Sequence, residues 1–88
     1  MEVSKRLSRA REELSVAQEQ ADALTEAADE ARVRALVSET PLAARESQEA
    51  RRHADAMAGA RDTLAGQVHR LEEELNELLD KLVPGQAT

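Results

Sequence analysis

The chain has 88 residues and a formal net charge of −6, from 12 basic and 18 acidic side chains, and it contains no cysteine and no aromatic residue. Disulfides and thiolate metal sites are therefore excluded, and the acidic balance argues against a general nucleic-acid-binding protein. Apolar residues make up 41% of the chain, but none is larger than leucine or methionine. Such side chains suit narrow helix–helix seams better than a wide globular core, and the composition is typical of coiled coils.

Residues 2–38 carry apolar side chains at alternating steps of four and three residues. This spacing places them on one stripe of an α-helix, at the a and d positions of a heptad repeat. The run has no polar interruption, so it predicts a first helix over about residues 2–38. Its members are Val3, Leu7, Ala10, Leu14, Ala17, Ala21, Leu24, Ala28, Ala31 and Ala35.

A proline separates this run from a second one. Pro41 would disrupt the interior of a helix, but it is tolerated at the first position of a new helix. Thr40, directly before it, is a preferred N-cap residue. We therefore expect a turn over residues 38–41 and a second helix that begins at Pro41.

Residues 41–83 form the second heptad run. A Pro-Gly pair follows Val83 and is a helix stop, so residues 84–88 are expected to form a disordered tail. Ser47 and Arg61 are the polar members of the stripe, and both occupy a positions. The stripe holds Ala43, Ser47, Ala50, Ala54, Met57, Arg61, Leu64, Val68, Leu71, Leu75, Leu78 and Leu82.

The short connection predicts an all-α fold, an antiparallel two-helix coiled-coil hairpin that forms one domain over residues 1–88. If facing a and d positions sum to 78, Leu7 lies opposite Leu71 in the seam. Ion pairs beside the seam then help to specify the register, although each is worth only a few tenths of a kcal/mol. The same register places Ala10 opposite Val68, and it pairs Arg6 with Glu74 and Arg34 with Glu46.

The predicted seam is rich in alanine near the turn and rich in leucine toward the free ends. A lone two-helix hairpin buries one stripe per helix and is marginally stable. We therefore expect two hairpins to pair as a homodimer, most simply a twofold four-helix bundle. Apolar residues outside the seam support this pairing: Val16, Ala23, Val33, Leu36, Val37, Ala58, Ala65 and Leu79.

Five residues of the second helix are candidate contacts with a partner. Arg51 and Arg52 belong to a short basic cluster that suits either a phosphate-bearing ligand or surface ion pairs. Arg61 is either a ligand contact or a residue that sets register while its guanidinium reaches solvent. Gly59 and Gly66 lie one heptad apart and indicate a face where another helix packs closely, although each costs about 1 kcal/mol of helix stability relative to alanine.

The sequence shows no catalytic, cofactor-binding or metal site. His53 and His69 lie 16 residues apart on one helix and cannot share a metal ion. Each has a glutamate four residues away, but two ligands are fewer than a zinc site needs. Nucleophile motifs and phosphate-binding loops are also missing, so we expect no enzyme. The sequence has no candidate membrane span or secretory leader, which predicts a cytoplasmic protein.

Three stretches carry a family resemblance: ETPLA at residues 39–43, ARESQEARRHADAM at 44–57 and LEEELNELLDKL at 71–82. They resemble small Ala- and Arg-rich helical-hairpin proteins of actinobacteria, most of which are uncharacterised. The helical-hairpin anti-sigma factor that binds cyclic di-GMP carries the signature Glu-x3-Ser-x2-Arg-x3-Gln-x3-Asp. That signature is absent here, which disfavours nucleotide binding of that type. Aligned on Ser15, its other four places hold Arg11, Gln18, Asp22 and Glu26.

Two functions of different classes fit these features. The leading hypothesis is a non-enzymatic protein–protein interaction module, a scaffold, adaptor or regulator that binds a protein partner through exposed helix faces. The alternative is a regulatory protein that binds a nucleotide or nucleic acid through the face between Arg45 and Arg61. The net charge of −6 makes nucleic acid the less expected partner.

Overall fold

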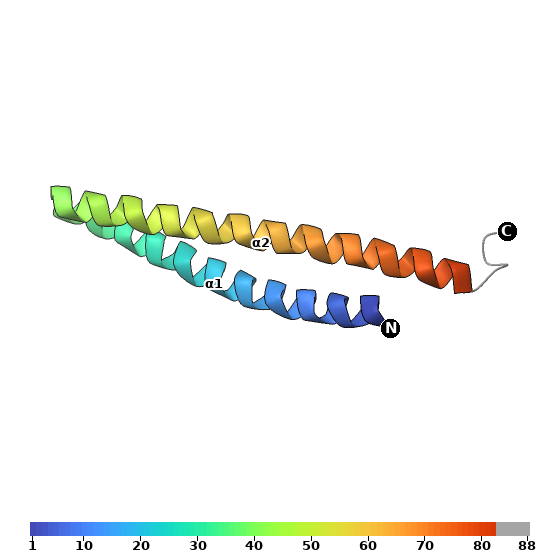
Figure 1. Ribbon diagram of the computed structural model, residues 1–88. Coiled ribbons are helices and arrows are strands. Elements are labelled where there is room, and N and C mark those ends of the chain that lie inside the picture. Colours follow the sequence, from blue (N-terminus) through green and yellow to red (C-terminus); the bar gives the residue numbers. More distant parts are fainter. Residues whose placement is uncertain (83–88) are drawn as a thin grey trace.

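A computed structural model describes residues 1–82, and within them the chain forms two long α-helices and no strand (Figure 1). Helix α1 spans Glu2–Ser38 and helix α2 spans Pro41–Leu82. The all-helical class and the helical hairpin are confirmed. The hairpin is an elongated, thin layer with principal extents of 67 × 23 × 13 Å. The expected helix end at Val83 and the expected tail lie outside the described residues.

Two residues with different roles build the turn. Glu39 adopts the left-handed conformation with φ 53°, and its N–H donates a hydrogen bond to the Ala35 carbonyl oxygen at 3.0 Å, which closes the last turn of α1. Thr40 caps α2, because its Oγ1 accepts a hydrogen bond from the Ala43 N–H at 3.1 Å. That bond satisfies one of the free N–H groups at the start of a helix. The N-cap is the predicted one, whereas a left-handed glutamate in place of glycine or asparagine was not predicted.

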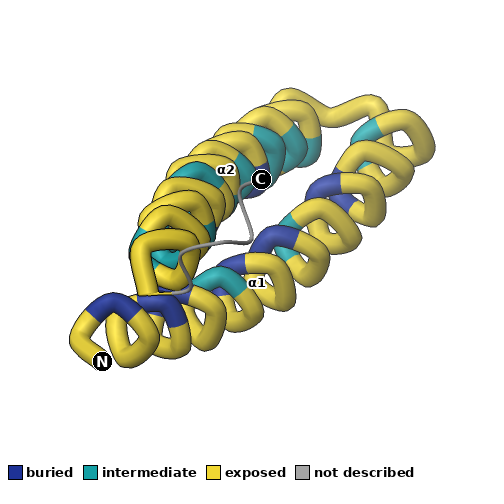
Figure 2. The backbone as a smooth tube through the Cα atoms, turned by 90° about the vertical axis from the view of Figure 1, so that its right-hand side faces the viewer, coloured by how far each residue is buried: buried dark blue, intermediate teal, exposed yellow. Residues whose placement is uncertain are grey.

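One seam between α1 and α2 holds the core. Figure 2 shows the buried residues of α1 on the side that faces α2. Every a and d residue of the first heptad run is buried or half-buried, as is every one of the second run from Ala43 to Leu78. Leu82 is exposed, since α2 has 42 residues against 37 in α1 and projects beyond its start (Figure 1).

The seam changes from small to large side chains along the hairpin. Ala21 and Ala28 are each 1% exposed and Ala54 is 2% exposed. Methyl groups of this size fill a close-packed interior only where the two backbones come close to each other. The bulkier core lies toward the free ends, where Leu7, Ala10 and Val68 are buried and Leu14, Leu71 and Leu75 pack against them.

Two ion pairs join α1 to α2 within the described residues. Arg11 Nη2 lies 2.9 Å from Glu72 Oε2, and Arg51 Nη2 lies 2.8 Å from Asp29 Oδ1. All four side chains are at least 43% exposed. Exposed charged groups can pair with several partners of similar energy. The predicted ion pairs, Arg6 with Glu74 and Arg34 with Glu46, are therefore not formed within residues 1–82.

Candidate docking surfaces

The hairpin layer presents a different surface on each side of its seam. On one side, Arg11 lines two neighbouring shallow grooves, one with His69 and Glu72 and the other with Ala65. We call this side the paired face, because it also carries both ion pairs between the helices. The opposite side has a groove lined by Glu12, Glu13, Val16, Ala17, Gln20, Met57, Ala60 and Leu64.

The opposite side is named here the neutral face. In α1 the heptad positions that flank the seam there, c and g, carry no ionisable residue between Glu13 and Glu30. In α2 they carry only His53 between Glu49 and Arg70. The face therefore has a central stretch without formal charge, flanked by charged ends. Its residues are Val16, Gln20, Ala23, Ala27, His53, Ala56, Ala60, Thr63 and Gln67.

The five candidate contact residues from the sequence do not form one site. Arg51 lies on the paired face and binds Asp29, as the surface ion-pair interpretation expects. Arg52, the other residue of the basic cluster named above, is exposed. Arg52, Gly59 and Gly66 follow one another at heptad spacing at f positions, on the outer edge of α2 and away from α1.

Arg61 occupies a seam position, but its guanidinium group points out of the seam toward Asp62. Both Nε and Nη2 donate hydrogen bonds to Asp62 Oδ1, at 3.1 and 3.0 Å. The Arg61 side chain is 29% exposed and lies beside Leu14 in a groove of the paired face. The aliphatic stem thus stays against the seam while the guanidinium binds a neighbouring exposed carboxylate. This geometry favours a role in setting register over a role in holding a ligand.

The two glycines of α2 are not required by packing within the hairpin. A Cβ atom at Gly59 would meet nothing within 4 Å, and one at Gly66 would lie 3.6 Å from Nη1 of Arg70, an ordinary van der Waals distance. Neither glycine has the positive φ that would exclude an alanine. Any need for glycine here must come from something outside the described chain.

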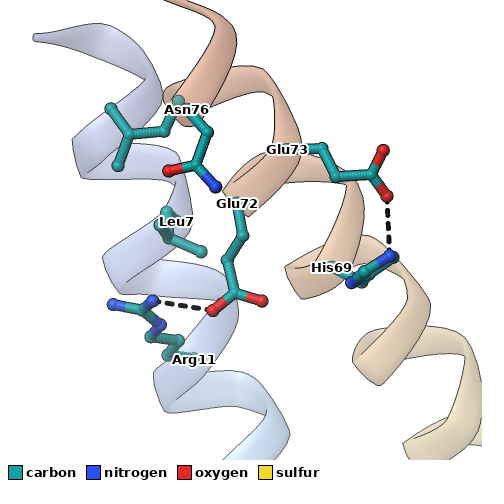
Figure 3. Close-up of a pocket in the computed structure, with 7 residues that line it drawn as sticks. Leu7, Arg11, His69, Glu72, Glu73 and Asn76 are labelled. Atoms are coloured by element: carbon teal, nitrogen blue, oxygen red, sulfur yellow. Dashed lines mark hydrogen bonds and ion pairs between the residues drawn. The ribbon is translucent and has the colours of Figure 1, made fainter. Parts of the chain in front are cut away.

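Charged side chains gather near the free end of the paired face, in the hollow drawn in Figure 3. Arg11 reaches from α1 to Glu72 of α2, and His69 Nε2 lies 2.6 Å from Glu73 Oε1 on α2 itself. Both glutamates are thus already paired with a basic side chain. Within residues 1–82, no group of three or more His, Cys, Asp and Glu side chains is arranged to hold a metal ion.

Seven valine and leucine side chains are exposed to solvent on the surface of the hairpin. They gather at three places: around the turn, at the middle of the neutral face, and at the projecting end of α2. Their exposed fractions range from 43% to 80%. They are Val33, Leu36, Val37 and Leu42 near the turn, Val16 in the middle, and Leu79 and Leu82 at the end.

Within residues 1–82, neither helix contains a stretch that is long and apolar enough to cross a membrane. Comparison with known proteins found no protein-family model, no curated protein and no solved structure that matches the chain. The resemblance to actinobacterial helical-hairpin proteins therefore stays a prediction.

Proposed function

We propose that the chain is a non-enzymatic protein–protein interaction module, an antiparallel coiled-coil hairpin that works as a dimeric four-helix bundle. The observation that carries this proposal is the set of seven valines and leucines that are 43–80% exposed, six of them outside the filled seam and one, Leu82, at the projecting end of α2. Clustered apolar surface on a small protein is typical of a surface that another protein covers. The hairpin alone leaves this surface in water.

Antiparallel pairing is supported by which residues meet. Arg11, early in α1, binds Glu72, late in α2, while Asp29, later in α1, binds Arg51, earlier in α2. The chain has no cysteine, so a designed cysteine pair reports the pairing directly. Ala10→Cys with Val68→Cys should close an intramolecular disulfide, because these residues share the buried cluster. The control pair, Ala10→Cys with Ala54→Cys, should stay reduced, and the reverse result would contradict the register.

The dimer is tested by sedimentation equilibrium at micromolar concentration. The expected species has twice the 9.6 kDa mass of one chain. A hairpin that stays a clean monomer under these conditions would overturn the dimeric form of the proposal. The subsequent search for a protein partner is best done with the dimer, since paired hairpins present the surface that a partner meets.

The alternative function, binding of a nucleotide or nucleic acid through the face between Arg45 and Arg61, has weaker support. Arg51 and Arg61 each bind an aspartate, so the positive charge they offer to a phosphate is partly neutralised. Titration with a labelled oligonucleotide and with a nucleotide at low salt is expected to give no binding. Salt-sensitive binding that Arg51→Ala with Arg52→Ala abolishes would reverse the preference between the two functions.

A further inference from the structure

We infer that a second copy of the chain docks on the neutral face, with Val16, Met57, Ala60 and Leu64 at the centre of the interface. This inference rests on the proposed dimer and adds which of the two faces forms it. The groove at this place lies between α1 and α2 and is lined mainly by apolar side chains. Val16 at its edge is 53% exposed.

Charge decides between the two faces. A twofold interface brings each surface against a copy of itself, so any excess of one charge meets the same charge. At its middle the paired face carries four aspartates, and Arg51 and Arg61 pair with two of them. Each copy therefore has an excess of two negative charges there, and a twofold interface would bring the excess charges of both copies together. The neutral face carries no carboxylate over the same length and can face itself without this repulsion. The four aspartates are Asp22, Asp29, Asp55 and Asp62.

Side-chain size also favours the neutral face. Alanine and threonine occupy most of its outward positions, and such short side chains let helix backbones of two hairpins approach closely. Met57 and Leu64 are half-buried by the seam, and both line the groove on this side. A second hairpin would cover the part of these side chains that the first leaves exposed. Val16 of each copy then contacts the groove of the other.

The dimensions of the layer suffice for a stable interface. A specific interface buries about 800 Å² on each partner, and the layer measures 67 by 23 Å, so about half of its length supplies that area. The part of α1 whose neutral-face positions carry no charge, from Val16 to Ala27, rises about 17 Å at 1.5 Å per residue. It is therefore the core of the interface, and the charged positions toward both ends form its polar rim.

The test places the same charge on each face in turn. Ala60→Glu lies on the neutral face, and Ala65→Glu, on the same helix and also exposed, lies on the paired face. In sedimentation equilibrium, Ala60→Glu is expected to raise the dimer dissociation constant at least tenfold, whereas Ala65→Glu changes it less than threefold. Far-ultraviolet circular dichroism checks that both variants remain helical. Equal weakening by both substitutions, or weakening by Ala65→Glu alone, would overturn the inference.

A second measurement applies if Ala60→Glu fails to fold. Spin labels on single cysteines, in Ala60→Cys and in Ala65→Cys, report the mobility of each site as the protein is concentrated. The label at position 60 is expected to become immobilised on dimerisation, and the label at 65 to stay mobile. A dimer in which only the label at 65 is immobilised contradicts the choice of face and leaves the proposed dimer standing. A wild-type chain that is monomeric throughout overturns both.

Discussion

Glu39, in the turn, adopts a backbone conformation that is unfavourable for a residue with a β-carbon. Its φ of 53° lies in the left-handed region, where the β-carbon crowds the following carbonyl oxygen at a cost of about 1–2 kcal/mol. Glycine avoids this contact but loses more backbone entropy on folding, by about 0.5–1 kcal/mol. We therefore expect Glu39→Gly to raise the free energy of unfolding by about 0.5–1 kcal/mol, measured by urea denaturation. Ser38→Gly, one residue earlier within α1, should instead lower it by about 0.5 kcal/mol.

Arg61 lowers the stability of the seam that contains it. Its neighbours in the stripe are apolar, and its guanidinium reaches the exposed Asp62 to find a partner. Arg61→Leu replaces this arrangement with a seam leucine and is expected to stabilise the hairpin by about 1–2 kcal/mol. Asp62→Ala removes only the exposed ion pair and should change stability by less than about 0.5 kcal/mol. A less stable Arg61→Leu, measured at the same protein concentration, would mean that the arginine itself supports the structure.

At the scale of the element, the heptad repeat explains why the hairpin is predictable. Every seam residue from Val3 to Leu78 is buried or half-buried, because periodicity alone places such residues on one side of a helix. The cap at Thr40 is equally local, since its side chain binds a backbone group three residues away. The ion-pair partners were not predictable, because a long exposed side chain can pair with several partners at nearly equal free energy. The pair of Arg11 with Glu72 is an example.

The candidate site was harder to predict than the fold. Arg52, Gly59 and Gly66 stood out by residue type, yet their heptad positions put them on the outer edge of α2. The sequence feature that points to the proposed docking face is the lack of charged residues at the c and g positions around Val16 and Ala60. That signal becomes visible only once the two helices are paired, because only then do these flanking positions lie on one face.

The glycines of α2 are open to a direct test. Room for a β-carbon exists at Gly59 and at Gly66, so alanine should gain its helix propensity without a steric cost. Each of Gly59→Ala and Gly66→Ala is expected to raise the free energy of unfolding by about 1 kcal/mol in urea denaturation. Arg52→Gly, at the equivalent heptad position, should lower it by about as much. A glycine variant with unchanged or reduced stability would mean that the added methyl group meets an obstacle, such as another copy of the chain.

At the scale of the whole molecule, folding and association are linked. One seam of mostly alanine and leucine is a small core for 88 residues, so much of the stability of the working form should come from the second hairpin. The thermal midpoint is then expected to rise with protein concentration, by about 4 °C for each tenfold increase, given an unfolding enthalpy near 0.7 kcal/mol per residue. Circular dichroism melts over a hundredfold concentration range measure this slope. Ala60→Glu should reduce the slope of the midpoint against concentration, and Ala65→Glu should leave this slope unchanged. A midpoint that does not depend on concentration in the wild-type chain would mean that the single hairpin is the stable unit.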